Sequence, residues 1–320
     1  MSPVVQCKND RNKIAAAAMT AALLFCAAPC LAAQGPPRYV AGAERVVLDS
    51  ALKDEDVQAA LLHINEHRKE MAEMLEALAG SEAGQGLERA RAGLVARRMR
   101  DIGLKDVTLE KGATPNVIGR IKGRSRGAIL FVSTLSYIPA IAQKENGDAS
   151  HGPRADGDRI TGPGTGGSAP TAAMLAAAAA IRASGVEPAR DLIFAALPPD
   201  DAGLQGMKRL YAAHGDSVVA VVDVQGDGSS IGCASEDQLP GIAESPLVGT
   251  AAAIVQWLGM EPKVTSSGSA SVRVATADAT PAIVLGGESE GTTGAHDEWA
   301  DIPTMLRSAK HIVLLAATLR

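Results

Sequence analysis

Two histidines in the first third of the chain have a spacing that could bind a metal ion. The segment His63-Ile64-Asn65-Glu66-His67 has the form His-x-x-Glu-His, which places the two imidazoles one helical turn apart. Two such imidazoles can share one metal ion. The same histidines also lie at the edge of an amphipathic stripe on a highly charged helix, where they would be ordinary surface residues. Both interpretations stay open at this stage.

A glycine-rich segment could hold an anion. Gly162-Pro163-Gly164-Thr165-Gly166-Gly167-Ser168 precedes a run of helix-forming residues. The first N–H groups of a helix have no partner within the helix, so a helix that begins here could bind a negative group. No Lys-Ser or Lys-Thr pair follows, so the segment is not a phosphate-binding P-loop. A tight turn is the plainer interpretation.

Helical and β-type patterns alternate along the chain and predict the fold class. Apolar residues at helical spacing predict helices over residues 57–78, 87–102, 169–183, 204–213, 247–258 and 302–319. Short β-type runs predict strands over residues 106–110, 116–121, 128–135, 191–197, 218–224, 271–275 and 282–285. Strands that alternate with helices are typical of a sheet covered on both faces. We therefore predict an α/β fold with a central mixed sheet between helical layers.

The N-terminal segment has the pattern of a secretory signal. Basic residues precede an apolar run over residues 14–30, and Leu31-Ala32-Ala33-Gln34 supplies small residues at a cleavage site. The run is shorter and richer in alanine than the roughly 20 strongly apolar residues of a spanning helix. We expect residues 1–33 to be a signal peptide that is cleaved. The mature protein is then expected in the periplasm or outside the cell, with no stable membrane span. An uncleaved N-terminal anchor is the alternative.

The charge balance argues against nucleic acid as a partner. The chain has 320 residues, a net charge of −5 and no long basic run, unlike the basic footprint of most nucleic-acid-binding proteins. After cleavage Cys233 would be the only cysteine, so no internal disulfide is expected. We expect partners among peptides, amino-acid-derived small molecules and proteins.

Several segments, taken in order, resemble the zinc-dependent metallopeptidase family of aminoacylase, succinyl-diaminopimelate desuccinylase, peptidase T and the glutamate carboxypeptidases. The segments span residues 116–120, 128–139, 156–164, 191–208 and 294–299. The resemblance implies a zinc-exopeptidase-like fold of three layers, α/β/α, formed by residues 34–320 as a single domain. The family usually inserts a lid domain near residue 225, but residues 225–246 are too few to fold as one. Related single-domain aminopeptidases lack this lid.

Members of the family hold two zinc ions with histidines and carboxylates, and several of these ligands are absent here. By the resemblance, Thr134 stands where the first His is expected and Ser136 where its Asp partner is expected. Gly167 stands where the Asp that bridges the two metals is expected. Neither Thr134 nor Gly167 supplies an imidazole or a carboxylate, so the bridge between two metals cannot form in the family's way.

Other positions of the family's site keep a metal-binding residue type. By the resemblance, Asp200 takes the position of the general base and Asp201 that of a ligand, in place of a Glu pair. Asp223 matches a further acidic ligand, and His296 matches the late His. Each metal would keep at most two protein ligands, one fewer than a catalytic zinc site usually has. Asp200 is also one methylene shorter than Glu, a loss of reach of roughly 1.5 Å. Zinc is therefore expected to bind weakly or not at all.

Each of these residues has a structural alternative. Asp200 and Asp201 precede a predicted helix and could cap it. Asp223 ends a predicted strand and could bond to neighbouring turn N–H groups. His296 could be a structural residue that is tied to Glu298.

Three functions follow from these observations, and the sequence does not decide whether the protein is an enzyme. We favour a pseudoenzyme that binds a peptide, an amino-acid derivative or a protein partner, because Thr134 and Gly167 replace two ligands together. The second hypothesis is a metal-dependent amidase or peptidase that uses a reduced site of Asp201, His296 and Asp223. The third is a zinc protease built on the histidines at 63 and 67.

Overall fold

Eight strands within the described part of the chain form a mixed central sheet. The computed structural model describes residues 42–81, 88–112, 115–135, 152–199, 204–267, 269–287 and 298–320. All of these belong to one compact unit that spans Pro36–Arg320. The segment expected to be a signal peptide, residues 1–33, lies outside the described ranges.

The strands of the central sheet occur in the order β1-β2-β6-β3-β7-β10-β8-β9. Their bounds are β1 Lys105–Leu109, β2 Val117–Ile121, β3 Ala128–Thr134, β6 Asp191–Leu197, β7 Val218–Val224, β8 Ser230–Cys233, β9 Lys263–Ser266 and β10 Ala282–Gly286. The central strands β6, β3, β7 and β10 are parallel, whereas β2 and β8 run antiparallel to the strands beside them in this set. Because both faces of the parallel strands are covered, their residues are almost continuously apolar and buried.

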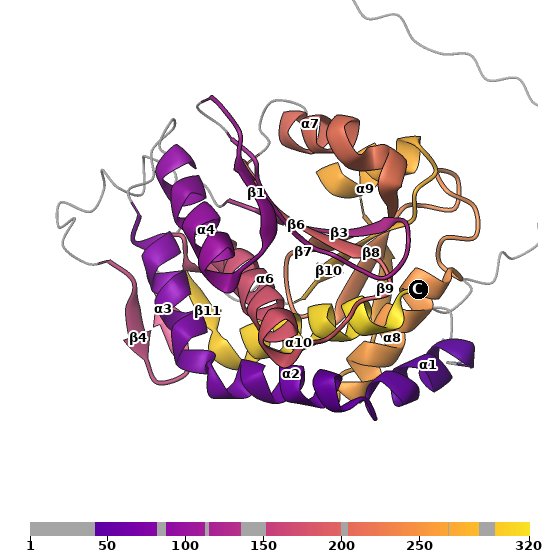
Figure 1. The fold of residues 1–320 in the computed structure, drawn as a ribbon, viewed down its shortest axis with the longest axis horizontal. Coiled ribbons are helices and arrows are strands. Elements are labelled where there is room, and N and C mark those ends of the chain that lie inside the picture. Colours follow the sequence, from indigo (N-terminus) through magenta and orange to yellow (C-terminus); the bar gives the residue numbers. More distant parts are fainter. Residues whose placement is uncertain are drawn as a thin grey trace, which may run out of the picture. The chain divides into compact units, whose positions relative to one another are not determined.

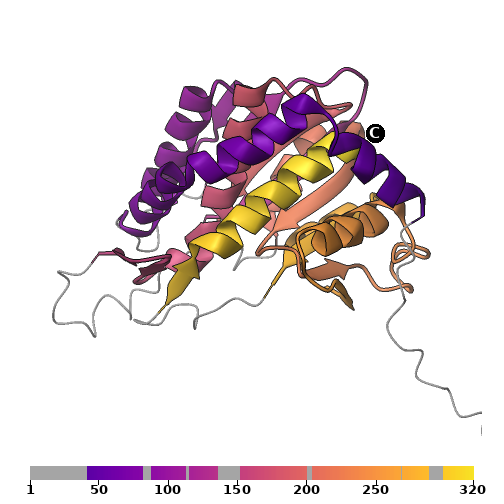
Figure 2. The same ribbon diagram turned by 90° about the horizontal axis from the view of Figure 1, so that it is seen from below.

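Helices cover both faces of this sheet (Figure 1). On one side lie α1 Ala43–Ala51, α2 Glu55–Glu66, α3 Arg68–Ala79, α4 Glu88–Ile102, α6 Thr165–Ser184, α8 Pro246–Trp257 and α10 Ile302–Thr318. On the other side lie α7 Gln205–His214 and α9 Ala270–Ala277. Helix α10 runs beside α6 beneath the sheet, and α2 lies outside both (Figures 1 and 2). The prediction of a three-layer α/β/α fold with a central mixed sheet is confirmed.

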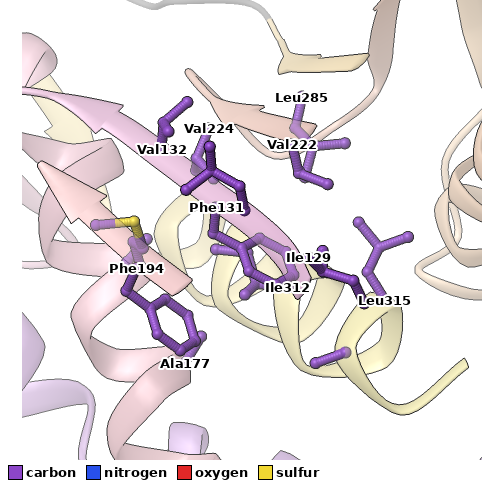
Figure 3. Packing of buried hydrophobic residues seen from close by; sticks show 14 of the residues in the cluster. Ile129, Phe131, Val132, Ala177, Phe194, Val222, Val224, Leu285, Ile312 and Leu315 are labelled. Atoms are coloured by element: carbon purple, nitrogen blue, oxygen red, sulfur yellow. The ribbon is translucent and has the colours of Figure 1, made fainter. Parts of the chain in front are cut away.

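Aromatic and aliphatic side chains join the sheet to α6 and α10. Phe131 of β3 and Phe194 of β6 stack with ring centroids 5.4 Å apart, and both are fully buried. Figure 3 shows this pair beside Ala177 of α6 and Ile312 and Leu315 of α10. Small alanines on α6 let the helix approach the rings closely, and each buried phenylalanine contributes about 1.5–3 kcal/mol.

A small antiparallel sheet positions the chain where helices α6 and α10 begin. It contains β4 Arg154–Asp156, β5 Arg159–Thr161 and β11 Trp299–Asp301, in the order β11-β5-β4. Strand β5 leads into the glycine-rich segment before α6, and β11 leads directly into α10. The guanidinium of Arg159 lies 4.0 Å from the centroid of the Trp299 ring, so a cation–π contact reinforces the pairing. This sheet therefore fixes the first turns of α6 and α10 relative to each other.

Two predicted elements differ from the structure. The helix predicted over residues 57–78 is broken at His67, whose φ of −99° and ψ of 24° separate α2 from α3. The strand predicted over residues 271–275 is wrong, because this segment belongs to helix α9. The Ser269 hydroxyl accepts a hydrogen bond from the Val272 N–H at 3.2 Å and caps that helix, an effect that outweighs the alternating valines.

Residues 225–246 do not form a separate layer. They include β8, which pairs with β10 and β9 and so extends the main sheet. The described helices include none that is both long and apolar enough to cross a bilayer.

Candidate functional site

A pocket of about 330 Å³ lies at the carboxyl ends of β3 and β7, beside the first turns of α6 and α10. Thr134, the last residue of β3, and Val224, the last of β7, line it from the sheet. Ligands of open α/β sheets bind in this position, outside the carboxyl ends of the strands. The pocket is therefore the first candidate for a functional site.

The two positions at which the family's metal ligands are absent line this same pocket. The side chain of Thr134 is exposed, and its main-chain carbonyl accepts a hydrogen bond from the Thr171 hydroxyl at 3.2 Å. Gly167 lies in the first turn of α6. The structure thus brings Thr134 and Gly167 together, where the resemblance places a histidine and a bridging carboxylate.

The first turn of α6 holds an anion that belongs to the chain itself. Glu298 is only 2% exposed, and its carboxylate accepts hydrogen bonds from the N–H groups of Gly164, at 2.6 Å, and Gly167, at 3.0 Å. Its main-chain carbonyl accepts a third from the Gly162 N–H at 2.7 Å. The positive end of the helix dipole favours a carboxylate in this place. The anion that the glycine-rich segment could hold is therefore the Glu298 side chain.

This arrangement requires glycine in the segment. Gly164 has a φ of +81°, in the left-handed region that favours glycine. A Cβ atom at Gly166 would lie 2.9 Å from an oxygen of Glu298, closer than carbon and oxygen normally approach. The sequence pattern connects Glu298 only with His296. The signal that could have found its role is the set of free N–H groups at the helix start, which need a partner when they are buried.

Asp223 is buried near the pocket and forms hydrogen bonds with residues at the start of α9. It is 4% exposed, and its carboxylate accepts hydrogen bonds from the side chains of Ser271, Gln225 (3.1 Å) and Ser269. Burial raises the pKa of Asp223 to about 6, although these three hydrogen bonds act in the opposite direction. From the sequence, neighbouring turn N–H groups were the alternative partners for Asp223. In the structure its partners are side-chain donors instead. Gln225 also lines the pocket, so it connects Asp223 to the pocket wall.

The remaining candidates lie outside the described residues. These are Asp200, Asp201 and His296, together with Ser136. Within the described ranges, no group of three or more His, Cys, Asp or Glu side chains is arranged to hold a metal ion.

The described positions do not fit the dinuclear zinc site of the family. Zinc requires imidazole, thiolate or carboxylate ligands, and neither Thr134 nor Gly167 has one. The Asp223 carboxylate is already engaged by two serines and a glutamine. Zinc at this pocket would therefore depend on ligands from the parts of the chain that are not described.

The rings of His63 and His67 do not face a common metal position. They stack with centroids 3.7 Å apart and an angle of 19° between the ring planes. The lone pair of an imidazole nitrogen lies in the plane of its ring, so the lone pairs of two stacked rings lie in two nearly parallel planes rather than pointing to one position. A shared zinc would need both nitrogens to converge at about 2.0–2.1 Å. Burial, and then the charge of His67, lower the pKa of His63. The geometry fits a packed surface pair.

The pocket wall is apolar with a few hydrogen-bonding groups. Trp299 and Met305 supply apolar surface, and no lysine or arginine occurs among the described lining residues. Asp301 also lines the pocket, but its carboxylate caps α10 through the Thr304 N–H and hydroxyl, at 3.0 and 2.9 Å. The buried Ser308 hydroxyl has no hydrogen-bond partner within the described structure. A ligand with both apolar surface and hydrogen-bonding groups suits this wall.

Several solved structures share this architecture, among them an aminopeptidase and a tripeptidase. LapB from Legionella pneumophila superimposes with a TM-score of 0.56 at 16% identity, over 88% of this chain and 77% of that chain. The aminopeptidase PepT from Bacillus cereus gives a TM-score of 0.59 at 12% identity, over 78% of this chain and 98% of that one. A tripeptidase from Staphylococcus aureus gives 0.58 at 12% identity, with the same coverage of 78% and 98%. This chain has a peptidase fold. No protein-family model and no curated protein sequence matches the chain.

Proposed function

We propose that this protein is an exported binding protein with a peptidase fold, which holds a peptide or an amino-acid derivative without hydrolysing it. The observation that carries the proposal is the shared position of Thr134 and Gly167. Both line the pocket at the carboxyl ends of the strands, and neither has a group that binds zinc.

The ligand class rests on the fold and on the pocket wall. Structures named as an aminopeptidase and a tripeptidase share the architecture, which favours peptides and their derivatives as ligands here. A short peptide or an acylated amino acid combines apolar surface with amide groups. The amides can bond to Thr134 and Gln225, and Trp299 can pack on the apolar part.

The proposed loss of catalysis rests on the family resemblance. In the resemblance, Asp200 has to act as general base from a shorter side chain, and a misplacement of about 1 Å can lower a rate on the order of a hundredfold. A hydrolase would also need zinc held by Asp201 and His296 without a bridging carboxylate. The competing function is this metal-dependent amidase or peptidase.

A binding and turnover experiment separates the two functions. Dipeptides, tripeptides and N-acyl amino acids are incubated with the protein plus zinc, and binding is followed by calorimetry while cleavage is followed by chromatography. We expect binding without cleavage. Hydrolysis that a chelator abolishes and zinc restores would contradict the proposal.

A matched pair of variants locates the binding. Thr134→Phe places a bulky ring at the pocket, on an exposed position, and should weaken binding at least tenfold. Thr108→Phe makes the same change at an exposed position of edge strand β1 and should bind normally. Equal binding by both variants would place the ligand elsewhere.

Export is the other part of the proposal and has its own test. We expect the protein in the periplasmic or secreted fraction, with an N-terminus near Ala33 or Gln34. N-terminal sequencing of exported material that still begins at Met1 would rule out cleavage.

A further inference from the structure

A second concave surface lies at the opposite edge of the sheet. Here β3 and β6 begin, with Ala128 and Asp191 as their first residues. A groove of about 520 Å³ is lined at this edge by Arg120, Lys122, Arg126, Arg190, Asp191 and Asp216. We refer to it as the basic groove. It has no residue in common with the pocket at Thr134.

The carboxylates of the basic groove do not balance its cations. Asp191 pairs with Lys122 at 3.0 Å and with Arg120 at 3.7 Å. Burial opposes ionisation of Asp191, but the Gly123 N–H at 2.9 Å and the Lys122 ammonium hold its pKa below the usual range. Asp216 is exposed. Four basic side chains thus surround two carboxylates, in a chain whose net charge is −5.

Two arginines of the groove have no carboxylate partner among the described residues. Neither Arg126 nor Arg190 forms an ion pair with any carboxylate in the described part of the chain. Arg190 donates to the main-chain carbonyl of Arg126, and its Nε atom is buried without a hydrogen-bond partner there. An anion in the groove would instead contact the guanidinium of Arg126, whose side chain is exposed.

The backbone that carries these arginines is fixed before any ligand arrives. The turn between β2 and β3 bonds to the segment before β6 through Arg124 N–H to Pro188 O, at 3.1 Å, and Ser125 N–H to Ala189 O, at 2.9 Å. A Cβ atom at Gly123 would lie 2.2 Å from the carbonyl carbon of Arg190, so only glycine permits this contact. A preorganised site loses less conformational entropy when it binds a ligand.

We propose that the basic groove binds a phosphate group, either as free phosphate or as the phosphate of a small phosphomonoester. A guanidinium presents its donors in a planar fork that matches two oxygens of a phosphate, and the groove offers two such groups without carboxylate partners. Phosphate is a dianion near pH 7.5, so it also offsets the excess charge of Arg120 and Lys122. Burial, and then the charge of Arg120, lower the pKa of His214.

Calorimetric titration at low ionic strength and pH 7.5 tests the proposal, with inorganic phosphate and phenyl phosphate as probes. Arg126→Gln removes one exposed arginine and should weaken phosphate binding about tenfold, the size expected for one charge-assisted contact. Asp216→Asn removes an exposed negative charge from the groove and should tighten binding roughly threefold. Changes in opposite directions at two surface positions do not arise from misfolding.

Two control variants make the same changes in charge at positions outside the basic groove. Arg97→Gln and Asp101→Asn alter exposed residues of α4. Helix α4 packs on the sheet face to which Gly119 points, since a Cβ there would lie 3.1 Å from the Met99 sulfur. Neighbouring strand residues point to opposite faces, so Arg120 faces away from α4. Both controls should bind phosphate as the wild type does.

The outcomes distinguish the source of the phosphate and can overturn the proposal. Equal affinity for both probes indicates free phosphate, and tighter binding of phenyl phosphate indicates an organic phosphate. The proposal is overturned if neither probe binds, if Arg97→Gln weakens binding as much as Arg126→Gln does, or if only a long polyanion such as heparin binds.

Discussion

Asp223 should make the stability of this protein fall as the pH rises from about 4 to about 6. Its folded-state pKa is about 6, whereas the ordinary value is 3.8. Between these values the folded protein keeps a proton that the unfolded chain has released, so folding takes up a proton. The contribution of Asp223 to stability is then highest at acidic pH and declines until Asp223 ionises in the folded state.

The size of this effect follows from the two pKa values. A difference between 3.8 and about 6, at 1.36 kcal/mol per pKa unit, corresponds to about 3 kcal/mol. Asp223→Asn is a neutral analogue of the protonated side chain and removes this term. Relative to the wild type, the variant should therefore gain about 2 kcal/mol between pH 4 and pH 8, because part of the full term already develops below pH 4.

Urea unfolding of both proteins at several pH values, with a chelator present, measures this difference. Asp191→Asn serves as the control, because the pKa of Asp191 is lowered rather than raised. The contribution of Asp191 is complete above its unfolded pKa and is lost only as the pH falls below that value. The difference between wild type and Asp191→Asn should therefore be constant from pH 5 to pH 8. Parallel stability curves for the wild type and Asp223→Asn would refute the reasoning.

Three further predictions concern the glycine-rich segment and the core. Glu298→Gln should reduce the free energy of unfolding by about 2 kcal/mol, because the negative charge at the start of α6 is lost. The control Glu261→Gln changes an exposed residue and should have no measurable effect. Gly166→Ala should destabilise the folded protein by about 1–3 kcal/mol, because the added methyl group would lie too close to Glu298. Gly93→Ala adds a methyl group in open space on α4 and should stabilise the protein slightly. Equal melting temperatures of the two variants would contradict this. Phe131→Ala should cost about 3–5 kcal/mol in urea unfolding, and a loss below 1 kcal/mol would contradict the core described above.

The central layers could be predicted from the sequence because their signals are local and strong. Strands β3, β6 and β7 are continuous apolar runs, and α10 shows a clear helical period, so each was found within a residue or two. The short strands β4, β5 and β11 have three residues each, too few to show a period. They depend on pairing between segments far apart in the chain.

The site was harder to predict than the fold, since its contacts are long-range. The resemblance identified Thr134 and Gly167, which do line one pocket. It did not show that Glu298 occupies the start of α6, a contact across more than a hundred residues. The partners of Asp223 were also missed, because Ser271 lies in the segment predicted as a strand and Ser269 lies just before it.

Restoring the missing ligands gives a gain-of-function test of this interpretation. The double variant Thr134→His with Gly167→Asp should bind zinc measurably more tightly than the wild type, even if hydrolysis does not return. Unchanged zinc affinity would show that the loss of these two ligands is not what limits metal binding.

The zinc content of the purified wild-type protein tests the central claim most directly. The protein is expressed with added zinc and measured by elemental analysis, beside His296→Ala and His63→Ala. The account predicts well under one zinc per chain in all three proteins. One zinc per chain in the wild type that is lost in His296→Ala, together with chelator-sensitive peptide hydrolysis, would contradict it and establish a single-metal peptidase. Zinc that is lost only in His63→Ala would instead place the metal at the paired histidines.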